Sequence, residues 1–241
     1  PISIDADEFA QAARRARGSA GVRGLRDSLG GNALAIGVDR LDYSKGLVEK
    51  FQAFGEFLRR HSGNTGGLTL LQVAPVSRGG VRSYRELRHE LERIAGHING
   101  RHADAQWTPI RYVNRNLGRQ TLAGYYGAAR LGLVTPLRDG MNLVAKEYVA
   151  AQDPEDPGVL LLSRFAGAAD QLGGAMLVNP YDTGGVADAI DAALRLGIDE
   201  RRERHAESLR SLREHDIHWW TAAFLEALDA RSTSRSRATT A

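Results

Sequence analysis

Six short apolar runs, each rich in Val, Ile or Leu, alternate along the chain with stretches of helical periodicity, and this alternation restricts the possible folds most strongly. The runs are 33–38, 68–74, 110–113, 131–135, 159–163 and 175–178. Strands that alternate with helices pair in parallel, and near-continuous apolar strands indicate helices on both faces. The sequence therefore predicts an α/β fold, a doubly wound, mostly parallel, Rossmann-like sheet. Its ligand crevice is expected at the carboxyl ends of the strands.

Helical periodicity is clearest between residues 81 and 98. Apolar side chains recur there with i, i+3, i+4 spacing and give one apolar face, at Val81, Tyr84, Leu87, Leu91, Ile94 and Ile98. Further helices are expected at 186–196, from about residue 200, and at 217–228. Residues 1–229 are expected to form one domain. The last stretch, "ARSTSRSRATTA" (230–241), predicts a disordered Ser/Thr/Arg-rich tail.

Composition removes several classes of function. The net charge of +3 comes entirely from three arginines in that tail, so it does not indicate a nucleic-acid partner. The chain has no Cys, which excludes a disulfide framework, a thiolate metal site and a thiol nucleophile. No run of about 18 apolar residues could span a bilayer, and the first residues do not resemble a signal peptide. A cytoplasmic protein without a membrane partner is expected.

A metal or other cofactor is not expected. His215 and His218 are spaced i, i+3, which could place two ligands together, but no third ligand is nearby and a capping or surface role is expected. The acidic stretch "AQDPEDPG" could imitate paired glycosidase carboxylates, yet its prolines indicate an acidic loop instead.

The stretch "TPLRDGMNLVAKEY" (135–148) joins a strand to a helix, with Gly140 at the turn. A helix N-terminus offers unpaired N–H groups and a positive dipole end, and glycine lets an anionic ligand come close. Glu147 lies four residues after Leu143 and therefore one turn deeper on the same face, where it could accept hydrogen bonds from a ribose diol. The alternative is a plain glycine turn with Glu147 on a solvated face.

Two more strand ends carry cations. The strand 33–38 runs into "DRLDYSKG", which places Arg40 and Lys45 at its carboxyl end. A planar guanidinium and an ammonium together suit a diphosphate without requiring a metal; the alternative is two exposed surface bases. The strand 68–74 leads into "PVSRGGV", which adds Ser77 and Arg78. Three strand ends thus offer anion-binding groups to one cleft.

Several segments resemble the bacterial trehalose-6-phosphate synthase family: "GVDRLDYSKG", "APVSRGGVRSYRELRHELERIAGHING", "WTPIRYVN", "LVTPLRDGMNLVAKEYVAAQDPEDPGVLLLSRFAGAADQL" and "LVNPYD". The resemblance covers about residues 1–229. It implies a two-domain GT-B glycosyltransferase that moves glucose from UDP-glucose, or another nucleotide glucose such as GDP-glucose, to glucose 6-phosphate. The implied product is α,α-trehalose 6-phosphate, and the implied reaction retains the anomeric configuration without a carboxylate nucleophile.

The resemblance also implies the roles of individual residues. Arg40 and Lys45 would bind the donor diphosphate and stabilise the charge of the leaving group, which makes them the catalytic pair. Asp139 and the amides of Gly140 and Met141 would hold donor glucose hydroxyls. The remaining expected contacts are Asn142, Leu143 and Val144 near the phosphates and nucleotide, Glu147 at the ribose, and Arg78 at the acceptor phosphate.

Family members carry an N-terminal domain with most of the acceptor-binding groups, and no counterpart is present in these residues. We therefore expect the C-terminal donor-binding half, which binds nucleotide sugar but is inactive alone. Trp219, Trp220 and Phe224, on a helix that packs against the N-terminal domain in such enzymes, are expected to be partly exposed. The sequence leaves open which nucleotide the donor carries. It also leaves open whether the chain forms a homo-oligomer.

Two other functions remain open on the sequence. One is a regulatory or donor-binding subunit that binds nucleotide sugar without turnover. The other is a pseudo-glycosyltransferase that joins cyclitols in aminocyclitol biosynthesis, which the intact "SRG" and "RDGMNLVAKEY" patterns disfavour.

Overall fold

Six parallel strands form one sheet in the order β3-β2-β1-β4-β5-β6. The computed structural model describes residues 2–61, 67–75 and 82–238, with the backbone alone for 82–83 and 229–238. Each predicted strand is found within one residue of its expected ends. The strands are β1 (Ala33–Val38), β2 (Leu68–Val73), β3 (Ile110–Val113), β4 (Leu131–Val134), β5 (Val159–Ser163) and β6 (Met176–Val178).

The direction in which successive strands are added to the sheet reverses between β1 and β4. The chain builds β1, β2 and β3 outward to one side, then crosses back and builds β4, β5 and β6 to the other. In open parallel sheets a ligand crevice forms beside such a switch point, at the carboxyl ends of the strands. The predicted doubly wound parallel fold is therefore confirmed, and its switch point lies between two of the three strands that were expected to carry the site.

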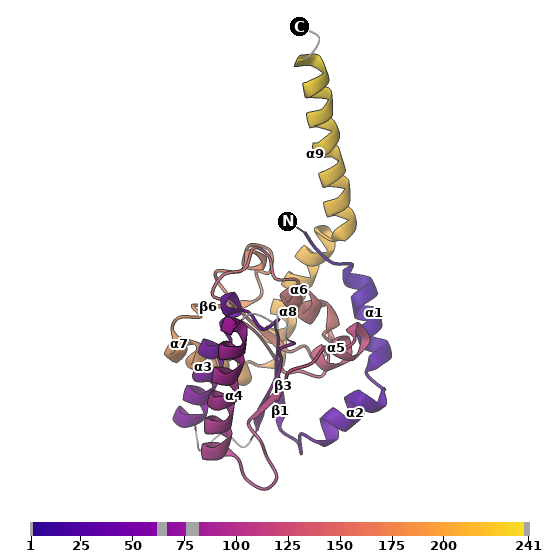
Figure 1. Cartoon of the computed structure of the whole chain (residues 1–241). Coiled ribbons are helices and arrows are strands. Elements are labelled where there is room, and N and C mark those ends of the chain that lie inside the picture. The colour runs from indigo at the N-terminus through magenta and orange to yellow at the C-terminus, as the bar shows by residue number, and fades with distance from the viewer. Residues whose placement is uncertain (1, 62–66, 76–81, 239–241) are drawn as a thin grey trace.

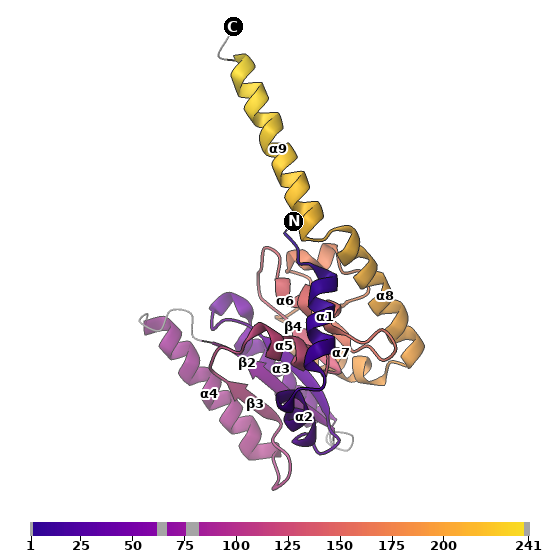
Figure 2. The same cartoon turned by 90° about the vertical axis from the view of Figure 1, so that its right-hand side faces the viewer.

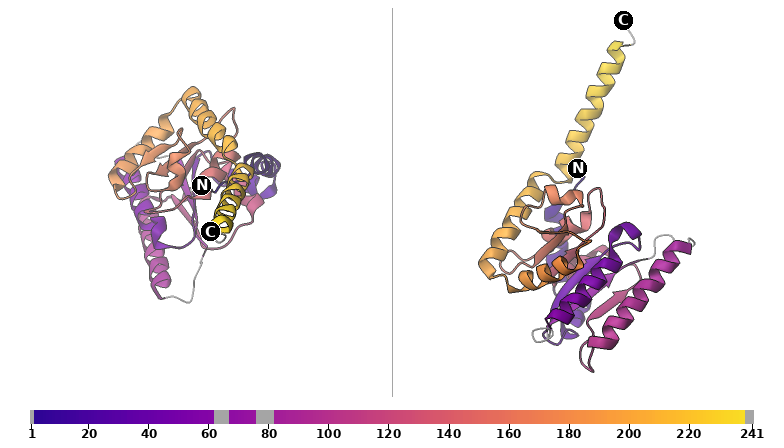
Figure 3. Two further views of the ribbon diagram at one scale, coloured as in Figure 1. Left: turned by 90° about the horizontal axis from the view of Figure 1, so that it is seen from above. Right: turned by 90° about the vertical axis from the view of Figure 1, so that its left-hand side faces the viewer.

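Helices cover both faces of the sheet (Figures 1 and 2). One apolar core lies under α3 (Leu47–Arg60), α4 (Arg82–His102) and α7 (Thr183–Arg195), and the right-hand view of Figure 3 shows α3 and α4 side by side. The second core lies under α1 (Ala6–Ala16), α5 (Arg119–Tyr126), α6 (Leu143–Ala151) and α8 (Ile198–Glu214), and α2 (Ala20–Asp27) packs against α5. Two short 3₁₀ turns, η1 (Tyr43–Lys45) and η2 (Gly167–Asp170), complete this part of the chain.

The sequence periodicities produce these two cores directly. Along β1, Ala35 enters one core while Leu34 and Ile36 enter the other, because successive strand side chains point to opposite faces. The helix predicted from the spacing of residues 81–98 is α4, and its apolar face is buried at Leu87, Leu91, Ile94 and Ile98. Val81 lies outside the described residues.

The last helix, α9 (Ile217–Ala238), projects away from the domain (Figures 1 and 2). Its first turn is joined to the N-terminal segment by the amide of Ile217, which donates to the carbonyl of Ile4 at 3.2 Å. Trp219 and Phe224 are exposed, as expected, while Trp220 is partly buried and stacks on Phe224. The backbone is helical through Ala238; the tail predicted over 230–241 includes residues outside the described ones, and its disorder stays a prediction.

Among the helices of the described residues, none is long and apolar enough to cross a membrane.

Candidate functional site

A cavity of about 450 Å³ opens at the switch point, above the carboxyl ends of β1 and β4. Residues that follow β1 and β2 form one wall, and the loop between β4 and α6 with the first turn of α6 forms the other. The lining residues are Val38, Asp39, Arg40, Lys45, Pro75, Asp139, Met141, Asn142, Leu143 and Val144. Seven of the nine predicted donor-site residues thus line one cavity, and the other two, Gly140 and Glu147, do not.

Local hydrogen bonds place Lys45 in this cleft. Asp42 caps η1 by accepting hydrogen bonds from the backbone N–H and the hydroxyl of Ser44, at 2.9 and 3.0 Å. The hydrogen bond from the backbone N–H holds the pKa of Asp42 below its usual value. The carbonyl of Ser44 accepts from the amides of Leu137 and Arg138 at 2.8 and 3.2 Å, which fastens η1 to the loop after β4. Gly46 follows with φ 62°, a left-handed conformation that favours glycine. These bonds set two strand-end loops side by side.

Lys45 and Asp139 form an ion pair across the cleft, with Nζ and Oδ2 separated by 2.6 Å. Both side chains keep about 15% of their surface exposed, so a ligand can reach them. Arg40 lines the same cavity, is exposed, and makes no ion pair within the described residues. An anionic ligand would meet one unpaired guanidinium and one ammonium that a single carboxylate holds in place.

Helix α6 begins at Leu143, three residues after the turn predicted at Gly140. Asn142, with φ 75°, caps α6 by accepting from the amide of Ala145 at 3.2 Å, and its amide group donates to Asp139 at 3.1 Å. The N–H groups of Leu143 and Val144 have no acceptor among the described residues, and both residues line the cavity. A helix N-terminus is therefore present at the cleft, with Asn142 in the left-handed backbone conformation, and anion binding there stays a prediction.

Gly140 has room beside it. A Cβ at this position would meet no protein atom within 4 Å, and its φ lies outside the left-handed region. Neither the fold of the described chain nor the turn itself requires a glycine here. The free space is consistent with the prediction that an anionic ligand approaches the backbone at Gly140.

Glu147 lies one turn along α6, beyond the part of the helix that lines the cavity. Tyr126 donates its hydroxyl to Glu147 at 3.4 Å, and burial raises the pKa of the carboxyl. The alternative of a solvated surface glutamate does not fit this burial. The ribose contact expected for Glu147 stays a prediction, and Arg78, the expected acceptor-phosphate ligand, lies outside the described residues.

A loop from β5 supports the donor side of the cleft. The amide of Gly167 donates to the carbonyl of Asp139 at 3.1 Å, and the amide of Ala168 donates to the carbonyl of Met141 at 2.8 Å. A Cβ at Gly167 would collide with the carbonyl oxygen of Gly140. This position, unlike Gly140, needs glycine because two backbones touch.

Sequence reasoning missed a buried polar cluster directly beneath the cavity. Lys50 on α3 places its Nζ 2.6 Å from Asp39 and 3.2 Å from the side-chain carbonyl of Gln72 on β2, and Gln72 donates back to Asp39 at 3.2 Å. Lys50 and Asp39 are almost completely buried. The available signals were a lysine beside the apolar Phe51 on α3 and a glutamine inside the fully buried β2.

Lys146 is a second buried lysine that the sequence did not reveal. Its Nζ donates to Gln171 at 2.6 Å, to the carbonyl of Ile2 at 3.0 Å and to the hydroxyl of Ser3 at 3.2 Å. No carboxylate is paired with it in the described chain, and burial lowers its pKa to about 8. Lys146 joins the N-terminal segment to the end of η2 and so to the loop behind the cleft.

The histidines behave as expected from their spacing. His215 contacts the carbonyl of Ser211 at 3.1 Å, and His218 lies 3.3 Å from the carboxylate of Asp5. Within residues 2–61, 67–75 and 84–228 we find no group of three or more His, Cys, Asp or Glu side chains that could hold a metal ion.

Comparison with known proteins places this cleft in a family. The model of glycosyltransferase family 20 matches residues 1–230. The chain is 48% identical over 231 residues to a trehalose-6-phosphate synthase of Sinorhizobium fredii, covering 96% of this chain and 50% of that protein. It is 52% identical over 204 residues to the enzyme of Sodalis glossinidius, covering 85% and 43%. The chain thus spans about half the length of the curated relatives it matches.

Solved structures show the same fold. An α,α-trehalose 6-phosphate synthase from Burkholderia multivorans superposes with a TM-score of 0.96 at 50% identity, covering 100% of this chain and 51% of that one. The enzyme of Burkholderia xenovorans in complex with glucose-6-phosphate gives 0.93 at 46%, covering 94% and 50%. The E. coli protein bound with UDP-2-fluoro glucose gives 0.91 at 46%, covering 95% and 50%. The match over residues 1–230 and the agreement in fold show that this chain belongs to glycosyltransferase family 20.

Proposed function

We propose that this chain is the donor-binding half of a UDP-forming α,α-trehalose-phosphate synthase. The whole enzyme would transfer glucose from UDP-glucose to glucose 6-phosphate and give α,α-trehalose 6-phosphate. The observation that carries the proposal is the cleft at the switch point, where Arg40 and Lys45 face the N-terminus of α6. Relatives bound with a UDP-sugar analogue and with glucose-6-phosphate support the choice of donor and acceptor.

In this proposal the diphosphate of the donor lies between the two cations and the free N–H groups of α6. Arg40 offers a bidentate fork, while Lys45 exchanges part of its pairing with Asp139 for a phosphate oxygen. Asp139 then accepts from the donor glucose hydroxyls, assisted by the amides of Gly140 and Met141. Glu147 accepts from the ribose at the deeper end of the helix.

Catalysis in this proposal consists mainly of stabilising the departing diphosphate. Positioned donors aimed at developing negative charge contribute several kcal/mol to a transition state, about 3 kcal/mol for one donor. The departing phosphate itself accepts the proton of the attacking hydroxyl on the same face of the sugar, which retains the anomeric configuration. No carboxylate nucleophile is needed, and Asp139 is occupied with binding.

The acceptor half of the active site would lie on a second domain that faces this cleft. Arg78 would reach across to the acceptor phosphate. The exposed Trp219 and Phe224 on α9 offer an apolar surface for packing against that domain. Cytoplasmic location and any self-association remain proposals of the same kind.

Two measurements test the proposal. Calorimetry with UDP in the presence of EDTA should show binding, because two side-chain cations and a helix N-terminus neutralise the diphosphate without a metal. A turnover assay with UDP-glucose and glucose 6-phosphate should give product only when the N-terminal half of a relative is supplied. Binding that the chelator abolishes would contradict the metal-free site, and turnover by the lone chain would contradict the split active site.

The relatives that the chain matches are trehalose-6-phosphate synthases, which favours this function over the two alternatives left open by the sequence, a non-catalytic donor-binding subunit and a pseudo-glycosyltransferase.

A further inference from the structure

A second polar cavity, of about 260 Å³, lies at the opposite, amino edge of the sheet. Its walls are the residues that precede β4 (127–130), the loop that precedes β5 (152–158), and side chains from α2, α8 and the end of α1. Because all six strands are parallel, their amino and carboxyl ends lie at opposite edges. None of the residues lining this cavity lines the donor cleft.

The cavity concentrates positive charge. Four arginines and two aspartates line it, which leaves a net charge of +2 where the surrounding chain is close to neutral. Only two ion pairs join them: Arg17 with Asp153 at 2.9 Å, and Arg201 with Asp156 at 2.6 Å. The other two arginines are Arg26 and Arg130.

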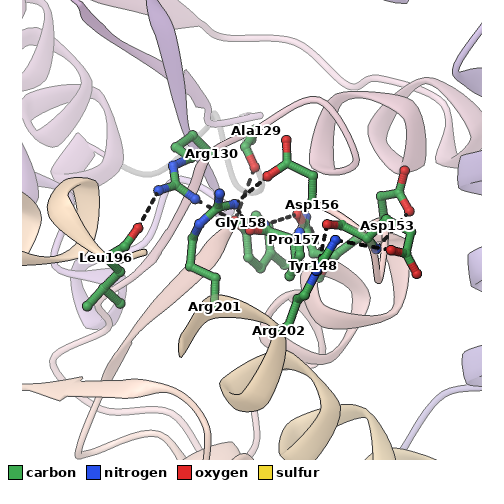
Figure 4. A network of polar contacts seen from close by, with 12 residues as sticks. Ala129, Arg130, Tyr148, Asp153, Asp156, Pro157, Gly158, Leu196, Arg201 and Arg202 are labelled. Carbon is green, nitrogen blue, oxygen red and sulfur yellow. Dashed lines mark hydrogen bonds and ion pairs between the residues drawn. The ribbon is translucent and has the colours of Figure 1, made fainter. Parts of the chain in front are cut away.

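Arg130 and Arg201 converge at the floor of the cavity (Figure 4). Both donate to the carbonyl of Pro157, at 3.5 and 2.5 Å, and Arg130 also donates to the carbonyl of Leu196 at 3.2 Å. Burial and the neighbouring charge of Arg201 lower the pKa of Arg130. Two guanidinium groups therefore share one backbone oxygen and repel each other.

A purely structural role explains part of this arrangement. Pro157 lies in the loop before β5 and Leu196 caps the end of α7, and arginine donors commonly satisfy carbonyls left free at such ends. That role does not use the Nε of Arg201, which is buried and has no partner. It also does not use the guanidinium of Arg26, which is exposed and makes no hydrogen bond or ion pair with the described residues.

We propose that this cavity binds a phosphate dianion, either free or as the monoester of a small sugar. A dianion would neutralise the excess charge, and its oxygens would accept from the guanidinium forks at the floor and from Arg26 at the mouth. A ligand held there would occupy the protein together with a donor nucleotide, since the two cavities share no residue. The proposal does not rest on the donor assignment, which enters only the test, where UDP fills the other cavity.

Calorimetry with inorganic phosphate, at ionic strength matched with chloride, tests this site. UDP is present at saturation so that phosphate does not enter the donor cleft. The unmodified chain should bind phosphate; Arg26→Ala should weaken binding at least threefold, and Arg201→Gln about tenfold, as expected for one charge-assisted hydrogen bond. Arg26→Ala removes no side-chain hydrogen bond or ion pair within the described chain, so the fold should be unaffected.

Arg210→Ala is the matched control. This residue lies on α8 nine positions after Arg201, on the opposite side of the helix, and is exposed. Its substitution should leave phosphate affinity unchanged. A hexose 6-phosphate titrated in the same way identifies the ligand: tighter binding than inorganic phosphate indicates the ester, and equal binding indicates the free ion. Absence of phosphate binding, or equal loss in all three variants, would overturn the proposal.

Discussion

Two lysine–aspartate pairs beneath and within the donor cleft have the same 2.6 Å separation but opposite surroundings. Lys50 and Asp39 are at most 2% exposed, whereas Lys45 and Asp139 are about 15% exposed. A buried pair is joined by further hydrogen bonds, here from Gln72, because nothing else can solvate its charges. A pair in an open cleft can exchange partners with a ligand. The same ion pair therefore supports the fold where it is buried, and where it is accessible it is available for the binding role that we propose.

The largest effect should come from breaking the buried pair. Lys50→Met removes the cation and leaves Asp39 unpaired, which should lower the free energy of unfolding by about 3–5 kcal/mol. Urea denaturation measures this. Lys45→Met, the matched change in the open cleft, should cost less than about 1 kcal/mol. Equal losses in the two variants would show that burial does not separate the pairs.

The second prediction uses Lys146, which is buried without a carboxylate. Its pKa is lowered to about 8 in the folded chain, below the usual value for the unfolded chain, so the unfolded state binds more protons between about pH 8 and 10. The free energy of unfolding should therefore rise with pH in this window. The rise in the unmodified chain should exceed that in Lys146→Met by about 2–3 kcal/mol. Denaturation series at several pH values measure the difference, and parallel curves for the two proteins would contradict it.

The third prediction concerns binding at the open pair. Lys45→Ala should weaken UDP binding by about 1.5–3 kcal/mol, the range for hydrogen bonds to charged groups. Added salt should weaken UDP binding to the unmodified chain more than to Lys45→Ala, because the variant has one fewer charge contact with UDP that salt can screen. Calorimetry at two ionic strengths tests both statements. An unchanged affinity would remove Lys45 from the donor site.

The smallest effect on stability is expected at Gly140. Gly140→Ala meets no protein atom, so the free energy of unfolding should change by less than about 0.5 kcal/mol, while UDP-glucose binding weakens if the ligand touches this backbone. Gly167→Ala is the contrasting control, because its Cβ would strike the carbonyl of Gly140 and should destabilise the chain. Unchanged affinity for UDP-glucose in Gly140→Ala would show that the donor does not approach this position.

The strands and the cleft were predictable because their signals are local. A strand buried on both faces is a continuous apolar run, and the residues after it must lie at the carboxyl edge of a parallel sheet. Arg40, Lys45 and Asp139 could therefore be assigned to one crevice before any coordinates. The start of α6 was less predictable, since Met141 and Leu143 are both ordinary helix residues and only the left-handed backbone of Asn142 fixes the boundary.

The sequence by itself determined the alternation of strands and helices, the two apolar cores and the strand ends that meet at the cleft, because hydrophobic periodicity acts over neighbouring residues. Only the tertiary structure decided which polar side chains are buried: Lys50 reaches Asp39 and Gln72, and Lys146 reaches Ser3 and Gln171. The arginine cavity at the amino edge likewise joins residues 17, 26, 130 and 201. Charges so distant along the chain acquire their partners, and their cost of desolvation, only when the fold brings them together.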